Sequence, residues 1–439
     1  MEGFFFYIYK KTLNSFYSKL YLILLAAVPL TPRFGATDNV ITHYFSLGLV
    51  ALYGLVLILI SNKEFKLFKV NYFNLPGLSF LGFFLLASLS YFFAINKVES
   101  LIALSKIFIF LIHIYIFYKL KLYEVLSEKL ILFSILSLLL IESVVSIYPV
   151  IEIVSVTSYK LEFANNFLKG LAGNKNITAA SLAMKIPFVL LVYHQYKNRL
   201  VKFISLFILT LVITNLLFLG SRASFISLFL IFTTYVLFIL FKNRNELNLS
   251  FLLKHIYIPF ILILSFLLFN SNVAQDDQGT IQNRVSSFVV DDLDESSLQR
   301  IRFYKQALKY SLENPLMGAG IGNWKVISVK LDKYYITSYI VPYVLHNDFL
   351  EVLGETNIIG LFFYVLFFIS IFYIIKKSYF HNKTKSIEYK YVLVILSLIA
   401  YLVDASLNFP MYRALMQTSL LLTLLYVLKL HSINKISKK

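Results

Sequence analysis

The sequence predicts an all-α polytopic membrane protein with about 12 transmembrane helices and one large, partly helical loop. Three observations support this fold class: the composition, the spacing of apolar runs, and the distribution of Lys and Arg. Of the 439 residues, 59% are hydrophobic and 15% are charged, and the mean hydropathy is +0.74. A soluble domain is about half apolar and about a quarter charged. Much of this apolar surface therefore needs a lipid bilayer as its solvent.

Apolar runs long enough to cross a bilayer recur along the chain. A spanning helix needs about 20 apolar residues to cross about 30 Å of hydrocarbon. The first run follows Lys10, Lys11 and Lys19 without a convincing small-residue cleavage site, so we expect a spanning helix rather than a removed signal peptide. The runs occupy residues 20–37, 42–61, 74–95, 100–118, 130–150, 176–194, 203–220, 224–241, 255–270, 357–375, 391–408 and 412–430.

Lys and Arg are distributed unevenly between the two sides that these runs define. If the N-terminus is cytoplasmic, the inside segments hold most of the basic residues of the short loops, as the positive-inside rule requires. The sequence therefore predicts a chain with both termini in the cytoplasm. The same bias explains the net charge of +18, so we expect no nucleic-acid partner. The absence of cysteine excludes disulfides, thiolate metal sites and a catalytic thiol.

One polar segment divides the chain into three parts. Residues 1–269 hold the first nine spans, residues 270–345 form a long loop, and residues 346–439 hold an interfacial helix and the last three spans. The loop falls on the outer side of the membrane and is too long for a simple connector, so we expect it to be folded. It should contain an amphipathic helix over Ser297–Glu313, ended by the Pro- and Gly-containing stretch 315–322.

His346 begins a short polar helix at the outer interface that runs to Glu355. An imidazole at this position could act as a base near neutral pH. It could equally be a histidine that only forms hydrogen bonds at the interface, and the residues alone leave both interpretations open.

Two arginines are candidates for binding an anion. Arg222 lies in the tight outer turn between two spans, where a charge so close to hydrocarbon is costly without a partner. Arg300 lies on the loop helix, and a guanidinium fork binds phosphate through two hydrogen bonds. Alternatively, Arg222 reaches toward lipid headgroups, and Arg300 and the nearby Arg302 are solvated loop charges.

Further polar residues lie before and within the predicted spans. Asn174 and Asn176 precede the sixth span, where their amides could bind sugar or phosphate, or Asn174 could cap the helix. Lys185 and Glu142 lie inside spans, where ionisable residues either serve function or pair with each other. Asp292 and Asp294 have the spacing of a carboxylate pair for a divalent metal. No further oxygen or histidine cluster accompanies the pair, so we expect no metal and no cofactor.

Four short motifs occur in order within roughly residues 165–425. They are Gly173-Asn174-Lys175-Asn176, similar to G-N-x-N; Ser221-Arg222-Ala223-Ser224, similar to S-R-[GA]-[ST/A]; Arg300 to Trp324, similar to R-x-x-x-W-x-x-A-L followed by P-L-x-G-x-G-x-G-N-[FW]; and His346 to Gly360, similar to H-[NSQ]-x9-G-x-x-G. Tyr304 stands where Trp is usual, and Asn357 stands where the first glycine of the last motif is usual. Asn tolerates a left-handed backbone better than most residues. Together the motifs resemble the O-antigen ligase and O-antigen polymerase superfamily of membrane glycosyltransferases.

The resemblance implies a GT-C-like glycosyltransferase of the bacterial cytoplasmic (inner) membrane, with its active site on the periplasmic face. The implied donor is a glycan on undecaprenyl diphosphate, and the acceptor is a lipid or a glycan, first of all lipid A-core in lipopolysaccharide biosynthesis. It implies that His346 is catalytic, either as the base or as the group that orients the acceptor hydroxyl, and that Arg222 and Arg300 bind the diphosphate. Transfer would invert the anomeric centre and would need no metal. The remaining expected substrate-binding residues are Asn347, Asn174, Asn176 and Lys185.

Other functions stay open at this point. A polysaccharide polymerase and a protein O-oligosaccharyltransferase share the donor and differ only in the acceptor. A lipid or solute transporter would also have many spans, although the sequence shows no internal repeat of the kind that many transporters have.

Overall fold

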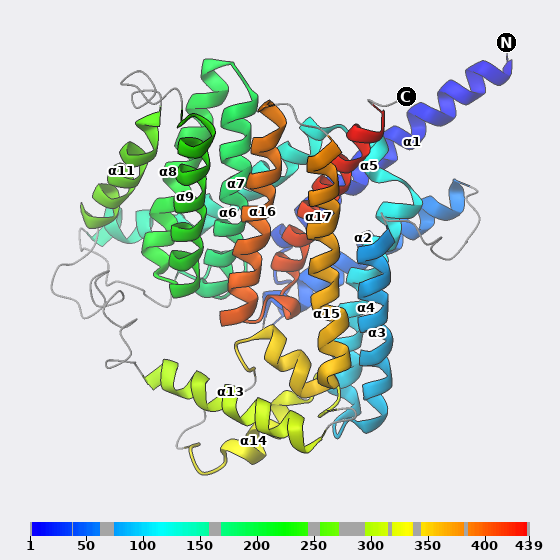
Figure 1. Ribbon diagram of the computed structural model, residues 1–439, viewed down its shortest axis with the longest axis vertical. Helices are drawn as coiled ribbons and strands as arrows, with labels where there is room; N and C mark the ends of the chain where they lie inside the picture. Colours follow the sequence, from blue (N-terminus) through cyan, green and yellow to red (C-terminus); the bar gives the residue numbers. More distant parts are fainter. Residues whose placement is uncertain are drawn as a thin grey trace. The chain divides into compact units, whose positions relative to one another are not determined.

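A computed structural model of the chain describes residues 2–36, 38–61, 74–157, 168–244, 255–271, 295–314, 318–336, 344–381 and 385–436. Regular structure in these residues is helical throughout (Figure 1). The elements are α1 (Glu2–Ala27), η1 (Val28–Leu30), α2 (Asn39–Ile60), α3 (Leu75–Ser90), η3 (Tyr91–Phe93), α4 (Lys97–Lys119), α5 (Leu122–Val125), α6 (Glu128–Thr157), α7 (Lys175–Gln195), α8 (Arg199–Leu219), α9 (Arg222–Lys242), α11 (Tyr257–Ser271), α13 (Glu295–Glu313), α14 (Trp324–Asp332), α15 (Asp348–His381), α16 (Lys385–Leu407), η6 (Pro410–Tyr412) and α17 (Ala414–Ile436).

Every predicted apolar run overlaps a helix, but two of the runs fall on apolar stretches that are shorter than a spanning helix. Within the described residues, 10 helices are long and apolar enough, namely α2, α3 with η3, α4, α6, α7, α8, α9, α15, α16 and α17. The runs at 20–37 and 255–270 lie on the shorter apolar stretches Ser15–Leu30 and Tyr257–Ser271. At 1.5 Å per residue, a 15-residue helix such as α11 covers only about 22 Å. The all-α, multi-span fold is thus confirmed, while the count of 12 spans is not.

The chain forms two compact units. Unit 1 comprises Met1–Ile131, Asp294–Asn382 and Ala405–Lys439, and unit 2 comprises Leu132–Leu293 and Lys383–Asp404. Each unit is described below by itself.

In unit 1, α15 packs along α3 through aromatic side chains. Phe80 lies 5.1 Å from Phe367, and Phe83 lies 5.2 Å from Tyr364, between ring centroids. Gly82 leaves room for this contact, because a Cβ there would lie 2.4 Å from the ring of Phe363. Edge-to-face and tilted ring pairs add to the free energy gained by burial. The close packing of α3 and α15 fixes the position of the residues at the start of α15.

In unit 2, α7 is the most enclosed helix, with 89% of its apolar window buried. It packs against α8 and α9. A helix that is apolar all round is expected to be buried on all sides, which agrees with the long run of buried residues over 177–192.

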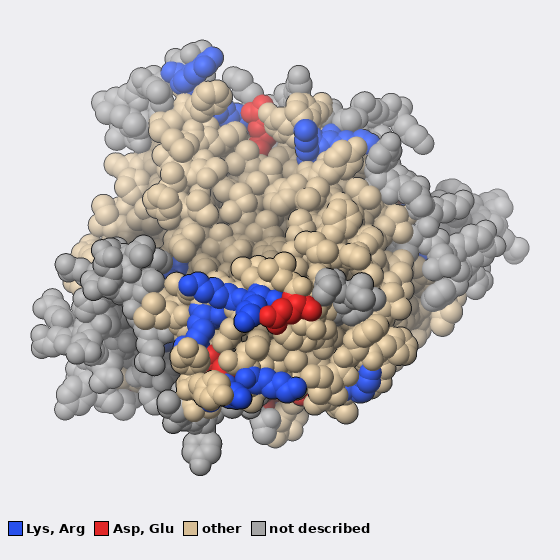
Figure 2. Space-filling model, turned by 60° about the horizontal axis from the view of Figure 1, so that its bottom comes forward, with Lys and Arg blue, Asp and Glu red and all other residues tan. Residues whose placement is uncertain are grey.

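The described part of the predicted loop is folded, with helices α13 and α14 at its centre (Figure 1). The sequence predicted the first of these over Ser297–Glu313, and α13 covers Glu295–Glu313. Phe303 and Ala307 of α13 form a small core with Trp324 and Leu345. Lys and Arg side chains gather on the surface that α13 and α14 present (Figure 2). This loop therefore offers a basic, ordered surface in unit 1.

Candidate functional site

A glycine-rich turn connects α13 to α14 and lies against the membrane helices of unit 1. The three glycines Gly318, Gly320 and Gly322 have φ angles of 60°, 82° and 74°. A Cβ on Gly318 would lie 2.5 Å from the carbonyl oxygen of Gly354, and one on Gly322 would lie 2.7 Å from that of Glu99. Because neither the backbone angle nor the space admits a side chain, these positions require glycine. The motif therefore serves to bring the loop close to α4 and α15.

Asn357 interrupts α15 after its first two turns. Its φ of 60° and ψ of −171° fall in a region that is almost exclusive to glycine. The side-chain amide compensates, since its Nδ2 donates to the carbonyl of Asn314 at 2.7 Å and its Oδ1 accepts from the N–H of Ile358. The φ angle is positive, but the ψ angle lies outside the αL conformation that Asn tolerates well, so these hydrogen bonds offset part of the strain. The kink separates the short helix 348–356 from the long helix that follows.

Asn347 caps the short helix that starts α15. Its Oδ1 accepts from the N–H of Leu350 at 3.0 Å, and its Nδ2 donates to the carbonyl of Ser406 at 3.0 Å. Both ends of the amide are therefore engaged within unit 1. In this structure Asn347 positions the residue before it, His346.

His346 has a left-handed backbone with φ of 56°. Its carbonyl accepts a hydrogen bond from the Tyr304 hydroxyl of α13 at 3.1 Å, and its ring meets the Phe409 ring edge-on at 5.3 Å. Its Nδ1 is buried and has no hydrogen-bond partner within the described part of the chain. A strained backbone and an unbonded imidazole nitrogen are features that concentrate at functional sites.

The charge state of His346 follows from its surroundings. Burial, and then the guanidinium groups of Arg300 and Arg413, lower the pKa of His346 to about 4. Both effects disfavour the imidazolium cation. The imidazole is therefore neutral at physiological pH and able to accept a proton.

Arg300 and Arg413 are the two cations that lower the pKa of His346, and they come from different elements. Arg300 of α13 donates from one Nη to the carbonyl of Leu407 at 3.1 Å. Arg413, which follows η6, lies with its guanidinium 4.7 Å from the centre of the Phe409 ring, the same ring that contacts His346. The sequence analysis predicted Arg300 as part of the site and did not single out Arg413.

Arg302 has a structural role in α13. Its guanidinium forms two bonds with the carboxylate of Asp332, Nε to Oδ1 at 2.7 Å and one Nη to Oδ2 at 3.0 Å. It also lies 4.1 Å from the centre of the Tyr335 ring. Arg302 is thus paired rather than a solvated charge, and it joins α13 to the end of α14.

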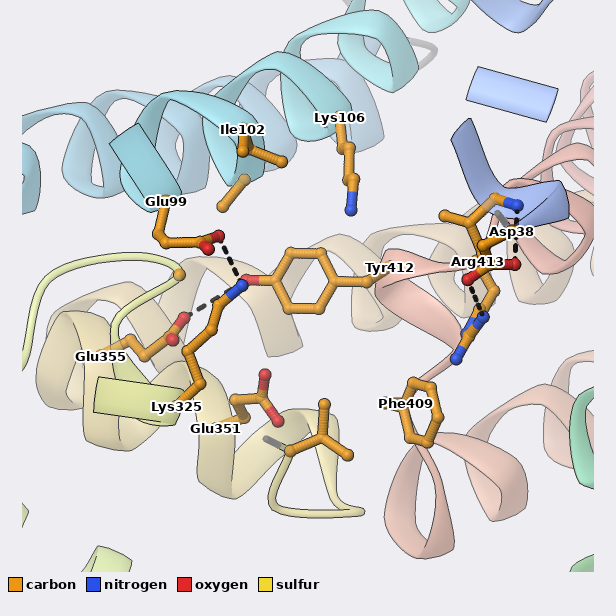
Figure 3. A pocket seen from close by; sticks show the side chains of 14 residues that line it. Asp38, Glu99, Ile102, Lys106, Lys325, Glu351, Glu355, Phe409, Tyr412 and Arg413 are labelled. Atoms are coloured by element: carbon orange, nitrogen blue, oxygen red, sulfur yellow. Dashed lines mark hydrogen bonds and ion pairs between the residues drawn. The ribbon is translucent and has the colours of Figure 1, made fainter. Parts of the chain in front are cut away.

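A cavity of about 340 Å³ lies next to this group in unit 1 (Figure 3). Val344, two residues before His346, lines this cavity. Phe409, whose ring contacts the ring of His346, lines it as well. Its charged and tyrosine lining comes from the start of α2, α4, α14, α15 and the residues around η6, and consists of Asp38, Glu99, Lys106, Lys325, Glu351, Glu355, Tyr412 and Arg413. The size falls within the range of small-molecule sites, about 300–1,000 Å³.

Two carboxylates of the short helix reach this cavity. Glu355 accepts from the Trp324 N–H at 2.8 Å and from the Tyr412 hydroxyl at 3.2 Å. Glu351 accepts from the Leu345 N–H at 3.0 Å with one oxygen. Their spacing of four residues places both on one face of the helix. This spacing was visible in the sequence, but the residues that meet them across the cavity were not.

The other predicted site residues belong to unit 2. Arg222 is the first residue of α9, after the αL residue Gly220 that ends α8. Asn174 caps α7, since its Oδ1 accepts from the N–H of Asn176 at 3.0 Å and of Ile177 at 3.3 Å. This is the capping role that the sequence offered as the alternative to substrate binding. The meeting of Arg222 with His346 stays a prediction, since they belong to different units.

Lys185 and Glu142 form an ion pair inside unit 2. The Lys185 Nζ lies 3.0 and 3.1 Å from the two Glu142 carboxylate oxygens, and both side chains are almost completely buried. Ser181 adds hydrogen bonds to both partners. The ammonium that the sequence assigned to substrate binding is therefore engaged with a carboxylate of α6.

No group of three or more metal-ligating side chains occurs in the part of the chain that the structure describes. Asp292 and Asp294 lie outside the described residues.

The fold and the site together define a multi-span helical membrane protein with a buried, cation-flanked imidazole beside a polar cavity. The family model described as O-antigen ligase matches residues 205–365, from α8 into α15. Residues 205–365 are therefore similar to the O-antigen ligase family, whose members are glycosyltransferase-like membrane enzymes. The match contains three of the four motifs that the sequence analysis used, and Gly173–Asn176 precedes it. A comparison with curated proteins gives no match.

Proposed function

We propose that the protein transfers a glycan from undecaprenyl diphosphate to an acceptor at the periplasmic face of the bacterial cytoplasmic membrane. The observation that carries this proposal is a neutral His346, flanked by Arg300 and Arg413, beside a cavity that can hold a second substrate. The similarity to the O-antigen ligase family supports the reaction class.

The diphosphate of the donor requires cations. Arg300 and Arg413 supply two guanidinium groups next to His346, and the basic surface of α13 and α14 attracts an anionic lipid headgroup (Figure 2). By resemblance to the O-antigen ligase and polymerase superfamily, Arg222 would add a third guanidinium group. Guanidinium groups stabilise the negative charge that grows on the leaving diphosphate in the transition state.

The reaction is a single displacement at the anomeric carbon of the donor sugar. The bond from that carbon to the phosphate oxygen breaks, and a bond to the acceptor oxygen forms on the opposite face, which inverts the centre. The diphosphate leaves as an anion and needs no proton. The acceptor hydroxyl gives its proton to His346, whose neutral ring has a free acceptor nitrogen when the other nitrogen carries the proton.

Binding of the donor would strengthen His346 as a base. In the free protein, burial and the two arginines hold the pKa of His346 at about 4. A bound diphosphate would offset both positive charges and raise that pKa toward neutrality. The imidazole would then be basic only when the donor is in place, which limits unproductive proton transfer.

The proposed acceptor is lipid A-core. The alternatives are a growing lipid-linked glycan, in a polymerase, and a protein. Purified protein in detergent, given undecaprenyl-diphosphate glycan and lipid A-core, should release undecaprenyl diphosphate and form the glycolipid. Activity without two compartments excludes a transporter. A chelator should leave the rate unchanged, and a rate restored only by magnesium or manganese would contradict the metal-independent mechanism.

Glycan profiles of a deletion strain separate the acceptors. Free core with accumulated lipid-linked polymer indicates a ligase, core capped with single repeat units indicates a polymerase, and normal glycolipid with unglycosylated proteins indicates a protein transferase. If the deletion strain shows none of these three defects and the purified protein transfers no glycan, the proposed function is wrong.

A further inference from the structure

Two of the three cations that line the cavity in unit 1 are paired with carboxylates. Lys325 forms an ion pair with Glu99, and Arg413 lies 3.8 Å from Asp38 (Figure 3). These pairs satisfy four charges of the lining. One joins α14 to α4, and the other joins the residue after η6 to the residue before α2.

Lys106 is the exception. In the described portion of the chain, no carboxylate lies within 4 Å of its ammonium. The ammonium lies instead 5.2 Å from the centre of the Tyr44 ring and 5.7 Å from that of Tyr412. Figure 3 shows the side chain extending from α4 into the cavity toward Tyr412.

An ammonium at this position needs an explanation. Lys106 lies on α4, a helix apolar enough to span a membrane, where an ionisable residue is costly and usually faces a partner or an aqueous site. Aromatic rings at more than 5 Å compensate only a part of that cost. The nearby carboxylates Glu99 and Asp38 already pair with other cations, so within the described residues the Lys106 ammonium is open to an anion that enters the cavity.

The rest of the lining suits a saccharide. Glu351 uses one oxygen for the Leu345 N–H, which leaves the other oxygen to accept from a sugar hydroxyl. Tyr412 adds a hydroxyl, and Phe409 adds an aromatic ring, which is a surface on which the C–H face of a sugar ring packs. Phe409 also contacts His346, so a sugar in the cavity would lie next to the proposed base.

We propose that this cavity is the acceptor site and that Lys106 binds an anionic group, a carboxylate or a phosphate, on the acceptor saccharide. The proposal rests on the proposed function. It adds an acceptor class, a sugar that carries negative charge, and a specificity residue outside the matched family segment.

Binding can be measured without transfer. Trp324 is the only tryptophan of the chain, it is buried, and its backbone N–H bonds to Glu355 of the cavity wall. Its fluorescence in the detergent-purified full chain is a reporter for methyl glucuronide, glucose 6-phosphate and methyl glucoside, and titration calorimetry gives the same binding without a reporter. The two anionic sugars should bind about tenfold or more tightly than the neutral one, as expected for one charge-assisted hydrogen bond.

Substitutions then test whether Lys106 supplies the positive charge that binds the anionic sugars. Lys106→Met should remove the preference for anionic sugars, and Lys106→Arg should keep most of it. Lys197→Met, at an exposed lysine between α7 and α8, is the control and should behave as wild type. Equal binding of the three sugars to the wild type, or an unchanged preference in Lys106→Met, would overturn the proposal.

Transfer kinetics separate this inference from the proposed function. In Lys106→Met the KM for an anionic acceptor should rise about tenfold while the KM for the donor stays the same. If the wild type transfers glycan and the acceptor KM does not change, the role of Lys106 is wrong and the function stands. If the wild type binds anionic sugars at Lys106 but transfers nothing, the function is wrong.

Discussion

Arg300 lies close enough to His346 for its guanidinium to help lower the pKa of the imidazole, after burial as the larger cause and together with Arg413. Arg300 lies on α13, and His346 lies just before α15. Tyr304, also on α13, donates a hydrogen bond to the His346 carbonyl and so connects the two elements. The cations that would hold the donor are therefore also the groups that set the protonation of the base. This double role leads to a prediction about pH.

Removing either cation should raise the pKa of His346 from about 4 toward its ordinary value of about 6.5. A general base works above its pKa and is lost as the pH falls through it. The acid limb of kcat/KM, which reports the free enzyme, should therefore move to higher pH in Arg300→Gln and Arg413→Gln. Lys197→Met, at an exposed lysine between α7 and α8, should leave the limb in place. Identical acid limbs in the wild type and both arginine variants would rule out this coupling.

His346→Ala should reduce transfer by about 10²–10⁴-fold, the usual contribution of a general base. Membrane insertion and donor binding should persist, because the Phe409 contact and the His346 carbonyl bond are small parts of the unit 1 core. Single-turnover rates with saturating donor measure the effect. Tyr304→Phe, which removes only the hydrogen bond to the carbonyl, is the control and should cost less than tenfold. A His346→Ala protein that transfers at the wild-type rate would refute the catalytic role.

Arg300→Lys should weaken donor binding by roughly tenfold or more, because an ammonium cannot reproduce two-point binding of a phosphate. One Nη of Arg300 already donates to the Leu407 carbonyl, so the fork is also held in orientation by the protein. The KM for the lipid-linked donor and its binding in detergent are the measurements. Arg302→Lys provides a contrast: it should disturb the pair with Asp332 and lower stability while the donor KM changes little. Unchanged donor affinity in Arg300→Lys would contradict the diphosphate role.

Local patterns predicted most of what lies along single elements. Apolar runs predicted the helices, the amphipathic pattern predicted α13, and the spacing of Gly318, Gly320 and Gly322 predicted a tight turn. The capping role of Asn174 and the pairing of Lys185 with Glu142 were also among the stated alternatives. Each of these depends on residues whose neighbours in space follow from periodicity or from the cost of burying a charge.

The cavity could not be predicted, because its lining comes from five elements far apart in the chain. Lys106 and Glu99 lie on α4, Lys325 lies on α14, and Arg413 follows η6. The packing of the Gly318–Gly322 turn against α4 and α15 brings Lys325 to Glu99. Arg413 was not singled out, since nothing in its local sequence indicates that it faces Phe409 and influences His346. The count of 12 spans is not confirmed, since the described residues hold 10 helices that are long and apolar enough to cross a membrane.

Asn357→Gly and Asn357→Ala should differ in thermal stability, with only the alanine variant clearly destabilised. Glycine relieves a backbone conformation that costs a non-glycine residue about 1–3 kcal/mol, and it loses the hydrogen bond to Asn314, worth about 1 kcal/mol. These terms nearly cancel, so Asn357→Gly should be close to wild type in stability and activity. Asn357→Ala loses the bond and keeps the strain, so its midpoint of thermal unfolding in detergent should fall clearly. Equal midpoints for the two variants would show that the left-handed backbone at this position is not strained.

Substitution of Lys185 and Glu142 distinguishes a structural ion pair from a substrate-binding lysine. Lys185→Met leaves the Glu142 carboxylate buried without its partner and should cost about 3–5 kcal/mol of stability. The double variant Lys185→Met/Glu142→Gln removes both charges and should recover most of that loss, because replacement of a whole buried pair is often nearly neutral. Thermal unfolding in detergent measures both. If the pair is only structural, the double variant should also bind donor and transfer glycan at close to the wild-type rate. A stable double variant with at least tenfold weaker donor binding would instead return Lys185 to the substrate site.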